Sequence, residues 1–321
     1  MKRKCYVGFD TSNYTTSIAV CTEEGEIALN LRQLLPVKEG ACGLRQSDAV
    51  FAHIKNLPDL CDALRQFLRE NEMEIAAVGV SRSPRTAADS YMPCFLSGIA
   101  VAHAFAAAAD APVWEFSHQD GHIMAAAYSS GEQERLLSAP FYAWHISGGT
   151  TEALLVEPHD AGFSVQCVGG SRDLHAGQVI DRVGVMLGLS FPCGVALEKL
   201  AADYAGKPTR AVISVQGGYC NLSGLENLAR KLYEDHGNTQ ECAAFVFDFL
   251  CRTILRMCEN LGAEHGARPF LFAGGVMSNR LMRGTLASAL DASFADPQFS
   301  ADNAAGIALL CRRAAENGGM K

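Results

Sequence analysis

Two histidines four residues apart are the clearest candidates for chemistry in this chain. His118 and His122 fall at the start of an expected helix, and side chains at positions i and i+4 share one helix face, so the two imidazoles could hold one metal ion. The alternative is a solvated or capping pair. Asp302 is the candidate third ligand, but Ser300 or Asp302 could equally cap the helix that follows. The pair is not an H-E-x-x-H metalloprotease motif, because its second residue is Gln119.

Two segments, residues 6–20 and 143–156, repeat one design. Each has an apolar strand, a tight turn rich in hydroxyls or glycine, a Thr-Thr pair and a second apolar strand. Inward-facing backbone amides in such turns form a concave anion site, and glycine lets a phosphate approach the main chain. The candidate anion-binding residues are Asp10, Thr11 and Ser12 in the first turn and Ser147, Gly148 and Gly149 in the second. Either could be an ordinary hairpin, but the repetition predicts two related lobes.

Two further segments could contact a nucleotide. Residues 270–280 read as a buried strand, a Gly-Gly turn and a helix start, where a base or ribose could lie against the glycines while Asn279 supplies polar contacts. Asp173 and Asp181 flank an Ala-Gly pair, and a carboxylate there could hold a ribose hydroxyl or a metal. Alternatively, the Gly-Gly turn could be required only for packing, and the two aspartates could be surface acids on an amphipathic helix.

Composition sets the class of the protein. The chain has 321 residues, 49% apolar and 19% charged, which is typical of a globular protein with a large core and suits two lobes. Twelve cysteines are scattered without a C-x-x-C pair, a pattern that predicts buried, reduced thiols.

Location and partners follow from charge and hydropathy. No stretch approaches the ~20 apolar residues of a membrane span, and the first residues lack the apolar run of a secretory signal, so we expect a cytoplasmic protein without a membrane partner. The net charge of −8 argues against unaided nucleic-acid binding through a broad basic face. An RNA partner would need a local patch or a helper protein.

The order of elements predicts a duplicated α/β fold. We expect strands at 5–10, 16–21, 26–34, 75–80 and 112–116, and again at 141–147, 151–157, 163–168, 269–273 and 293–295. Helical periodicity covers 47–70, where Pro58 marks a break or a new start, and 222–261 reads as one long helical region. Ligands of such folds bind at the strand ends.

Taken in order, these segments resemble the TsaD family, enzymes that attach threonylcarbamoyl to N6 of an adenosine in tRNA. The shared motifs are D-T-S at 10–12, S-H-x-x-G-H at 117–122, I-S-G-G at 146–149, A-G-x-x-x-D at 176–181, F-P-x-G-x-A-L-E-K-L-A at 191–201, L-S-G-L at 222–225, A-G-G-V-x-x-N-R at 273–280 and A-D-N-A-A at 301–305. The ordered set covers nearly the whole chain and is specific although each motif alone is weak.

The resemblance implies the duplicated fold of actin, hexokinase and other sugar-kinase-like ATPases, with lobes at 1–117 plus 302–321 and at 118–301 around a nucleotide cleft. It implies one divalent metal, iron or zinc, held by His118, His122 and Asp302. Threonylcarbamoyl-AMP or another adenine nucleotide would be bound by His145, Ile146, Ser147, Gly148, Gly149, Asp181, Gly194 and Asn279. The implied partners are tRNA and companion proteins of the threonylcarbamoylation pathway or a homo-oligomer.

Several positions depart from the family pattern. The usual E-T-S-C-D-E-T is D-T-S-N-Y-T-T at 10–16, the usual G-P-G-L is S-P-R-T at 83–86, and S-G-G-H ends in Thr150. Three acids are missing from 169–178, and Glu226 replaces the lysine after S-G-L. The metal set is retained while the phosphate and acid surroundings change, a pattern typical of a divergent paralogue.

Two functions therefore stand. In the first, the metal polarises an acyl-phosphate carbonyl and the glycine turn holds the departing phosphate, so that acyl transfer is directed by binding without an acidic nucleophile. In the second, the protein is a nucleotide-binding regulatory or assembly paralogue that has lost the transfer chemistry. A metalloprotease is disfavoured, since no glutamate lies within the His118–His122 motif.

Overall fold

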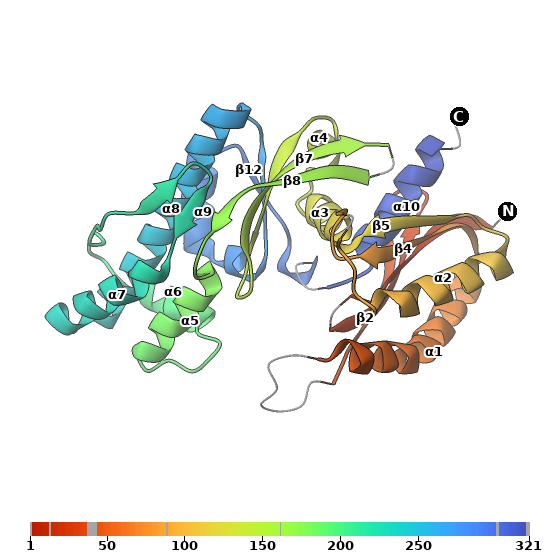
Figure 1. The fold of residues 1–321 in the computed structure, drawn as a ribbon, viewed down its shortest axis with the longest axis horizontal. Coiled ribbons are helices and arrows are strands. Elements are labelled where there is room, and N and C mark those ends of the chain that lie inside the picture. Colours follow the sequence, from red (N-terminus) through yellow and green to blue (C-terminus); the bar gives the residue numbers. More distant parts are fainter. Residues whose placement is uncertain are drawn as a thin grey trace. The chain divides into compact units, whose positions relative to one another are not determined.

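The chain forms two compact units, seen as ribbons in Figure 1. The computed structural model describes residues 2–12, 14–36, 44–87, 89–160, 162–299 and 302–318. Asn13, Ser300 and Ala301, which belong to motifs named above, lie outside the described residues. Unit 1 comprises Met1–Gln133, Pro158–Ser164 and Gln298–Lys321, and unit 2 comprises Glu134–Glu157 and Val165–Pro297.

Unit 1 is built on a five-stranded mixed sheet. Its strands are β1 (Arg3–Asp10), β2 (Thr15–Thr22), β3 (Ile27–Leu34), β4 (Met73–Ser83) and β5 (Val113–Ser117). The order is β3-β2-β1-β4-β5, with antiparallel pairing from β1 to β3 and parallel pairing of β1 with β4 and of β4 with β5.

Side chains alternate along the strands of this sheet, so its two faces pack against different helices. The helices of unit 1 are α1 (Gln46–Glu70), α2 (Phe95–Ala109), α3 (His118–Ser129) and α10 (Ala305–Gly318). Val7 and Phe9 of β1 join a buried cluster with side chains of α1 and α2, whereas Gly8 lies against the backbone of α10. Helix α1 continues through Pro58, because one lost hydrogen bond does not outweigh the buried face that carries Leu57, Leu60 and Leu64.

Helix α3 has its packing partners in unit 1, although we expected it to open the second lobe. The cause is a close approach to α10: a Cβ at Gly306 would meet the carbonyl oxygen of Gly121, and a Cβ at Gly121 would lie 2.9 Å from the Ile307 side chain. Only a pair of glycines allows the two helix backbones to come this near.

Unit 2 repeats the strand plan of unit 1. Its strands are β6 (Phe141–Ile146), β7 (Thr151–His159), β8 (Gly162–Ser171), β9 (Ser214–Gln216), β10 (Tyr219–Asn221), β11 (Phe270–Ala273) and β12 (Ala292–Phe294). The order β12-β11-β6-β7-β8 matches β5-β4-β1-β2-β3, with the same parallel and antiparallel pairings at β6. The expected duplication is therefore confirmed. The short β9 and β10 extend the sheet beyond β8 and were not predicted.

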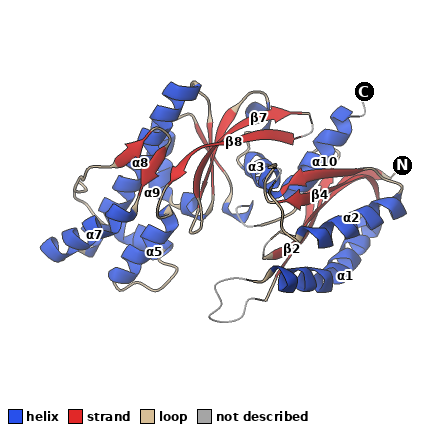
Figure 2. Ribbon diagram, viewed as in Figure 1, coloured by secondary structure: helices blue, strands red, loops and turns tan. Residues whose placement is uncertain are grey.

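Helices and strands of unit 2, coloured in Figure 2, share one core. The helices are α4 (Gln133–Leu137), α5 (Ala176–Met186), α6 (Gly194–Ala202), α7 (Ser223–His236), α8 (Thr239–His265) and α9 (Arg280–Ala289), with 3-10 turns at Gly275–Ser278 and Pro297–Phe299. The helical region expected at 222–261 is two helices. Gly237 ends α7 in the left-handed conformation (φ 65°), and the Asn238 side chain accepts hydrogen bonds from the first amides of α8.

The described ranges contain neither a membrane-spanning helix nor a disulfide. No helix there combines the length and apolar character that crossing a membrane requires. The described cysteines are free thiols, and most are buried.

Asp173 holds the start of α7. Its carboxylate accepts hydrogen bonds from the amides of Leu222 (2.7 Å) and Ser223 (3.1 Å) and from the Ser223 hydroxyl (2.6 Å). Burial alone would raise the pKa of Asp173, but these hydrogen bonds dominate and lower it to about 2. The Asp173 carboxylate, which was a candidate for binding a ribose or a metal, is thus hydrogen-bonded to groups of the protein itself.

We predict that Asp173→Ala lowers the free energy of unfolding by about 1 kcal/mol at neutral pH. The pKa of Asp173 is lower in the folded state than in the unfolded state, so its stabilisation is complete above about pH 4 and is lost as the pH falls toward about 2. Urea unfolding at several pH values would measure this. Asp235→Ala, on the same helix, should have little effect, and a wild-type advantage that stays constant down to about pH 2 would contradict the assignment.

Candidate metal centre and nucleotide pocket

A capping box fixes the histidine pair at the first turn of α3. The Ser117 hydroxyl accepts a hydrogen bond from the Asp120 amide (3.1 Å), and the Asp120 carboxylate accepts one from the Ser117 amide (3.1 Å). Helix α3 therefore begins at His118, and His122 follows one turn later on the same face. Their ring centroids are 4.3 Å apart.

Asp302 joins the two imidazoles from the segment that precedes α10. Its Oδ1 lies 3.2 Å from Nε2 of His122 and 3.5 Å from Nε2 of His118. One ligand atom from each of the three residues lies within 4.8 Å of the other two. The amide of Ala305, the first residue of α10, donates a hydrogen bond to the Asn303 side chain (3.0 Å). Asn303 and not Asp302 therefore satisfies this amide, and the Asp302 carboxylate pairs with the histidines.

Asp10, at the end of β1, orients His118. Its Oδ2 lies 2.7 Å from Nδ1 of His118, and its Oδ1 accepts a hydrogen bond from the Ser12 amide (2.7 Å). A hydrogen bond from Nδ1–H to this carboxylate leaves the Nε2 lone pair directed toward Asp302 and His122. Carboxylates commonly fix metal-binding imidazoles in this way.

The electrostatics of the cluster favour a cation. Burial disfavours the imidazolium form of His118, but the Asp10 and Asp302 carboxylates outweigh it and raise the pKa of His118 to about 10. Burial would raise the pKa of Asp302, yet the hydrogen bonds with both histidines lower it well below its usual range. The pKa of Asp10 is lowered as well, against its burial, by His118. Two imidazoles and one carboxylate form a donor set that suits zinc or iron and leaves a coordination position for another ligand.

The other members of the first turn contact protein groups. The Thr11 hydroxyl donates to the Cys94 carbonyl (3.0 Å) and accepts from the Gly98 amide (3.1 Å), which ties the turn to α2. The Ser12 hydroxyl is buried without a hydrogen-bond partner among the described residues. Asp10, Thr11 and Ser12, which were candidates for phosphate, thus lie beside the candidate metal ligand His118 and at the start of α2.

The divergent loop at 83–86 borders the same centre. The Gln119 amide of α3 donates to the Pro84 carbonyl (3.0 Å), and the Thr86 hydroxyl donates to Asp120 (3.3 Å). Arg85, one of the departures from the family pattern, therefore lies in a loop that is hydrogen-bonded to the first turn of α3. Both histidines belong to this helix.

Unit 2 contains a pocket of about 250 Å³ where the sequence predicts nucleotide contacts. Four of the eight predicted residues line it, namely Gly148, Asp181, Gly194 and Asn279. His145, Ile146, Ser147 and Gly149 are not among its lining residues. They belong to β6 and the turn that follows, and this turn supplies Gly148 to the pocket.

Close backbone approaches shape this pocket. A Cβ at Gly177, in the first turn of α5, would lie 2.7 Å from the Gly148 backbone, and the Gly177 amide donates to the Ser147 carbonyl (3.2 Å). Gly274 has φ 99° and lies against the Ile146 backbone. The start of α5 thus packs directly on the Ser147 turn, and open space beside Gly148 would let a phosphate approach the main chain of that residue.

The polar residues of the pocket are themselves held in place. Asp181 accepts a hydrogen bond from the Cys193 amide (2.8 Å), which fixes the turn that leads to Gly194. Oδ1 of the Asn279 side chain accepts a hydrogen bond from the Met282 amide (2.9 Å) and caps α9. Glu198 also lines the pocket and accepts a hydrogen bond from the Arg280 amide (2.7 Å). It was absent from our predicted site residues, although it belongs to the recognised 191–201 motif. Phe247, on α8, carried no sequence signal.

Comparison with known proteins shows the family of this chain. A family profile described as TsaD, tRNA N6-adenosine threonylcarbamoyltransferase, matches residues 40–309. The chain belongs to the TsaD family. That family comprises transferases that act on tRNA, and the resemblance inferred from the motifs is confirmed.

Solved structures support the fold of this TsaD family member. HypF from T. kodakarensis matches with a TM-score of 0.63 at 13% identity, over 98% of this chain and 48% of HypF, so the chain spans about half of that protein. Component A of (R)-2-hydroxyglutaryl-CoA dehydratase from Acidaminococcus fermentans matches with a TM-score of 0.53 at 13% identity, over 97% and 99% of the two chains. The expected duplicated fold of actin-like and sugar-kinase-like ATPases is confirmed.

We predict that Asp10→Asn weakens binding of a divalent metal by about 10- to 100-fold, because the amide cannot hold the His118 imidazole as the carboxylate does. Competition with a chromophoric zinc chelator would measure the affinity. Asp62→Asn, at an exposed acid of α1 that pairs with Arg65, is the matched control and should bind zinc as the wild type does. An unchanged affinity in Asp10→Asn would show that this carboxylate does not orient a metal ligand.

Proposed function

We propose that this protein transfers the threonylcarbamoyl group of threonylcarbamoyl-AMP to N6 of an adenosine in tRNA, with one divalent metal, iron or zinc, held by His118, His122 and Asp302. The observation that carries the proposal is the convergence of the His118–His122 pair with Asp302, which is remote in sequence, so that one ligand atom of each residue lies within 4.8 Å of the other two. Membership of the TsaD family supports the reaction class.

The transfer forms a bond between N6 and the carbamoyl carbon and breaks the bond from that carbon to the phosphate oxygen. AMP leaves with the electron pair, and N6 loses a proton. A bound metal would supply a Lewis acid that polarises the acyl-phosphate group. The protein's own part is to keep the imidazoles oriented through Asp10 and to leave a coordination position free for the substrate.

The pocket of unit 2 suits the AMP part of the substrate. The phosphate would lie against the main chain at Gly148, and apolar side chains such as Val195 and Val276 would flank the base. No acidic side chain need attack the substrate, so binding and orientation provide the catalysis. A tRNA acceptor, given the net charge of −8, favours a companion protein or a local basic patch for its capture.

A nucleotide-binding regulatory or assembly role is the second candidate. It is favoured by Arg85, a bulky residue at a glycine position of the family, in the loop bonded to α3. Another of the departures, Glu226, has a structural use, since it pairs with Arg182 and Arg230, both at 3.3 Å. In this role the protein would bind the nucleotide without forming modified adenosine.

A reconstituted assay separates the two roles. The full chain would be combined with threonylcarbamoyl-AMP, tRNA and the companion proteins of the pathway, and modified adenosine would be measured by mass spectrometry. We expect product from the wild type, and loss of both product and bound metal in the double variant His118→Ala, His122→Ala. His103→Ala, at an exposed histidine paired with Glu115, should keep both.

The outcomes of this assay differ in what they overturn. Nucleotide binding without product in the wild type would support the regulatory role. Unchanged metal content in the double histidine variant would remove the metal assignment.

We predict that Gly194→Leu weakens AMP binding at least tenfold, which is about 1.4 kcal/mol, because a side chain there occupies the pocket. No atom lies within 4 Å of a Cβ at Gly194, so the variant should fold. Gly224→Leu is the matched control, since it is also in the first turn of a helix, has the same open space and lies outside the pocket lining. Calorimetry would compare the two, and equal AMP affinities would place the nucleotide elsewhere.

A further inference from the structure

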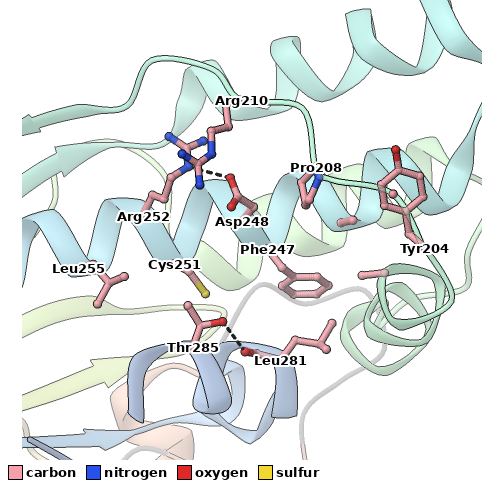
Figure 3. Close-up of a pocket in the computed structure, with 13 residues that line it drawn as sticks. Tyr204, Pro208, Arg210, Phe247, Asp248, Cys251, Arg252, Leu255, Leu281 and Thr285 are labelled. Atoms are coloured by element: carbon pink, nitrogen blue, oxygen red, sulfur yellow. Dashed lines mark hydrogen bonds and ion pairs between the residues drawn. The ribbon is translucent and has the colours of Figure 1, made fainter. Parts of the chain in front are cut away.

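A second pocket in unit 2, of about 380 Å³, lies between α6, α8, α9 and the segment that follows α6. Figure 3 shows the side chains around it, with α8 along one wall. Its volume falls within the range of small-molecule sites, roughly 300 to 1,000 Å³. Phe247 lines both this pocket and the nucleotide pocket, while the other lining residues are different.

One part of this second pocket is cationic. Arg252 donates from Nε to Asp248 (2.7 Å) and from Nη1 to the Ala211 carbonyl (3.0 Å), but its Nη2 is buried without a hydrogen-bond partner among the described residues. Arg210, next to Ala211 in the chain, is exposed and also lines the pocket. Both guanidinium groups lie on the Asp248 side in Figure 3. Two guanidinium groups and one carboxylate leave a formal charge of +1 in the lining.

The rest of the second pocket is largely apolar, apart from the hydroxyl groups of Tyr204 and Thr285. Phe247 and Leu255 of α8, Leu281 of α9 and Pro208 contribute carbon surface. The Thr285 hydroxyl is bonded to the Leu281 carbonyl (2.9 Å). Burial raises the pKa of the Cys251 thiol to about 12, so this side chain adds neutral surface and no nucleophile. The lining is therefore built for binding and carries no reactive group.

We propose that this pocket binds a small monoanionic carboxylate with an apolar or aromatic body. A carboxylate matches the planar guanidinium geometry of the exposed Arg210 and the single positive charge of the lining. A doubly charged phosphate is less suited, because Asp248 faces the same space and the remaining walls are apolar. The site is independent of the proposed transferase reaction.

The test uses 3-phenylpropionate and its neutral analogue 3-phenylpropionamide, titrated into the full chain by calorimetry. We expect a dissociation constant of about 1 mM or lower for the carboxylate and binding at least tenfold weaker for the amide. Arg210→Gln should weaken carboxylate binding roughly tenfold and remove most of the preference. An excess of AMP should not displace the carboxylate.

Arg210 is exposed, so Arg210→Gln should fold, and circular dichroism would confirm it. Arg230→Gln, an exposed arginine of α7 outside the pocket, should bind both compounds as the wild type does. The proposal is overturned by any of four results: no binding of the carboxylate at about 10 mM, equal binding of the amide, unchanged binding in Arg210→Gln, or displacement by AMP.

Discussion

The hydrogen bond between Asp10 and His118 is the contact on which the candidate metal centre depends. Asp10 is 1% exposed, and a buried carboxylate is stable only when paired and hydrogen-bonded. His118 and the Ser12 amide meet that need at 2.7 Å each. Because Asp10 ends the central strand of the sheet and His118 begins α3, the imidazole takes its orientation from the most buried part of unit 1.

The two units use one strand plan for different chemistry. In unit 1 the strand β1 ends in a carboxylate that anchors an imidazole, whereas in unit 2 the equivalent β6 leads into Ser147 and Gly148, beside which the start of α5 packs. Glycine at 148 and 177 lets backbone meet backbone and leaves room for a ligand phosphate. Duplication thus supplied two hairpins, and the residue types in their turns distinguish the candidate cation site of unit 1 from the candidate anion site of unit 2.

Local pattern was enough to predict the duplicated strands, the histidine pair and the Gly-Gly turn, because alternation and helical spacing are properties of short segments. It was not enough to place α3, whose packing depends on Gly306 some 180 residues away, or to choose between Asp302 as a ligand and as a cap. Glu198 could have been predicted as a site residue, because its motif was recognised. The pocket around Arg210 and Arg252 could not have been predicted, because its walls come from separate segments without a shared motif.

The order of the ligands along the chain has a consequence for how the centre is made. Asp10 and the histidines lie in the first half of the chain, whereas Asp302 lies some 180 residues later, and unit 1 includes residues from Gln298 onward. The two imidazoles share one helix, but the carboxylate reaches them only when α10 docks against α3 through Gly121 and Gly306. The complete candidate centre is therefore a product of tertiary folding, and a change that loosens the contact between these two helices also separates its members.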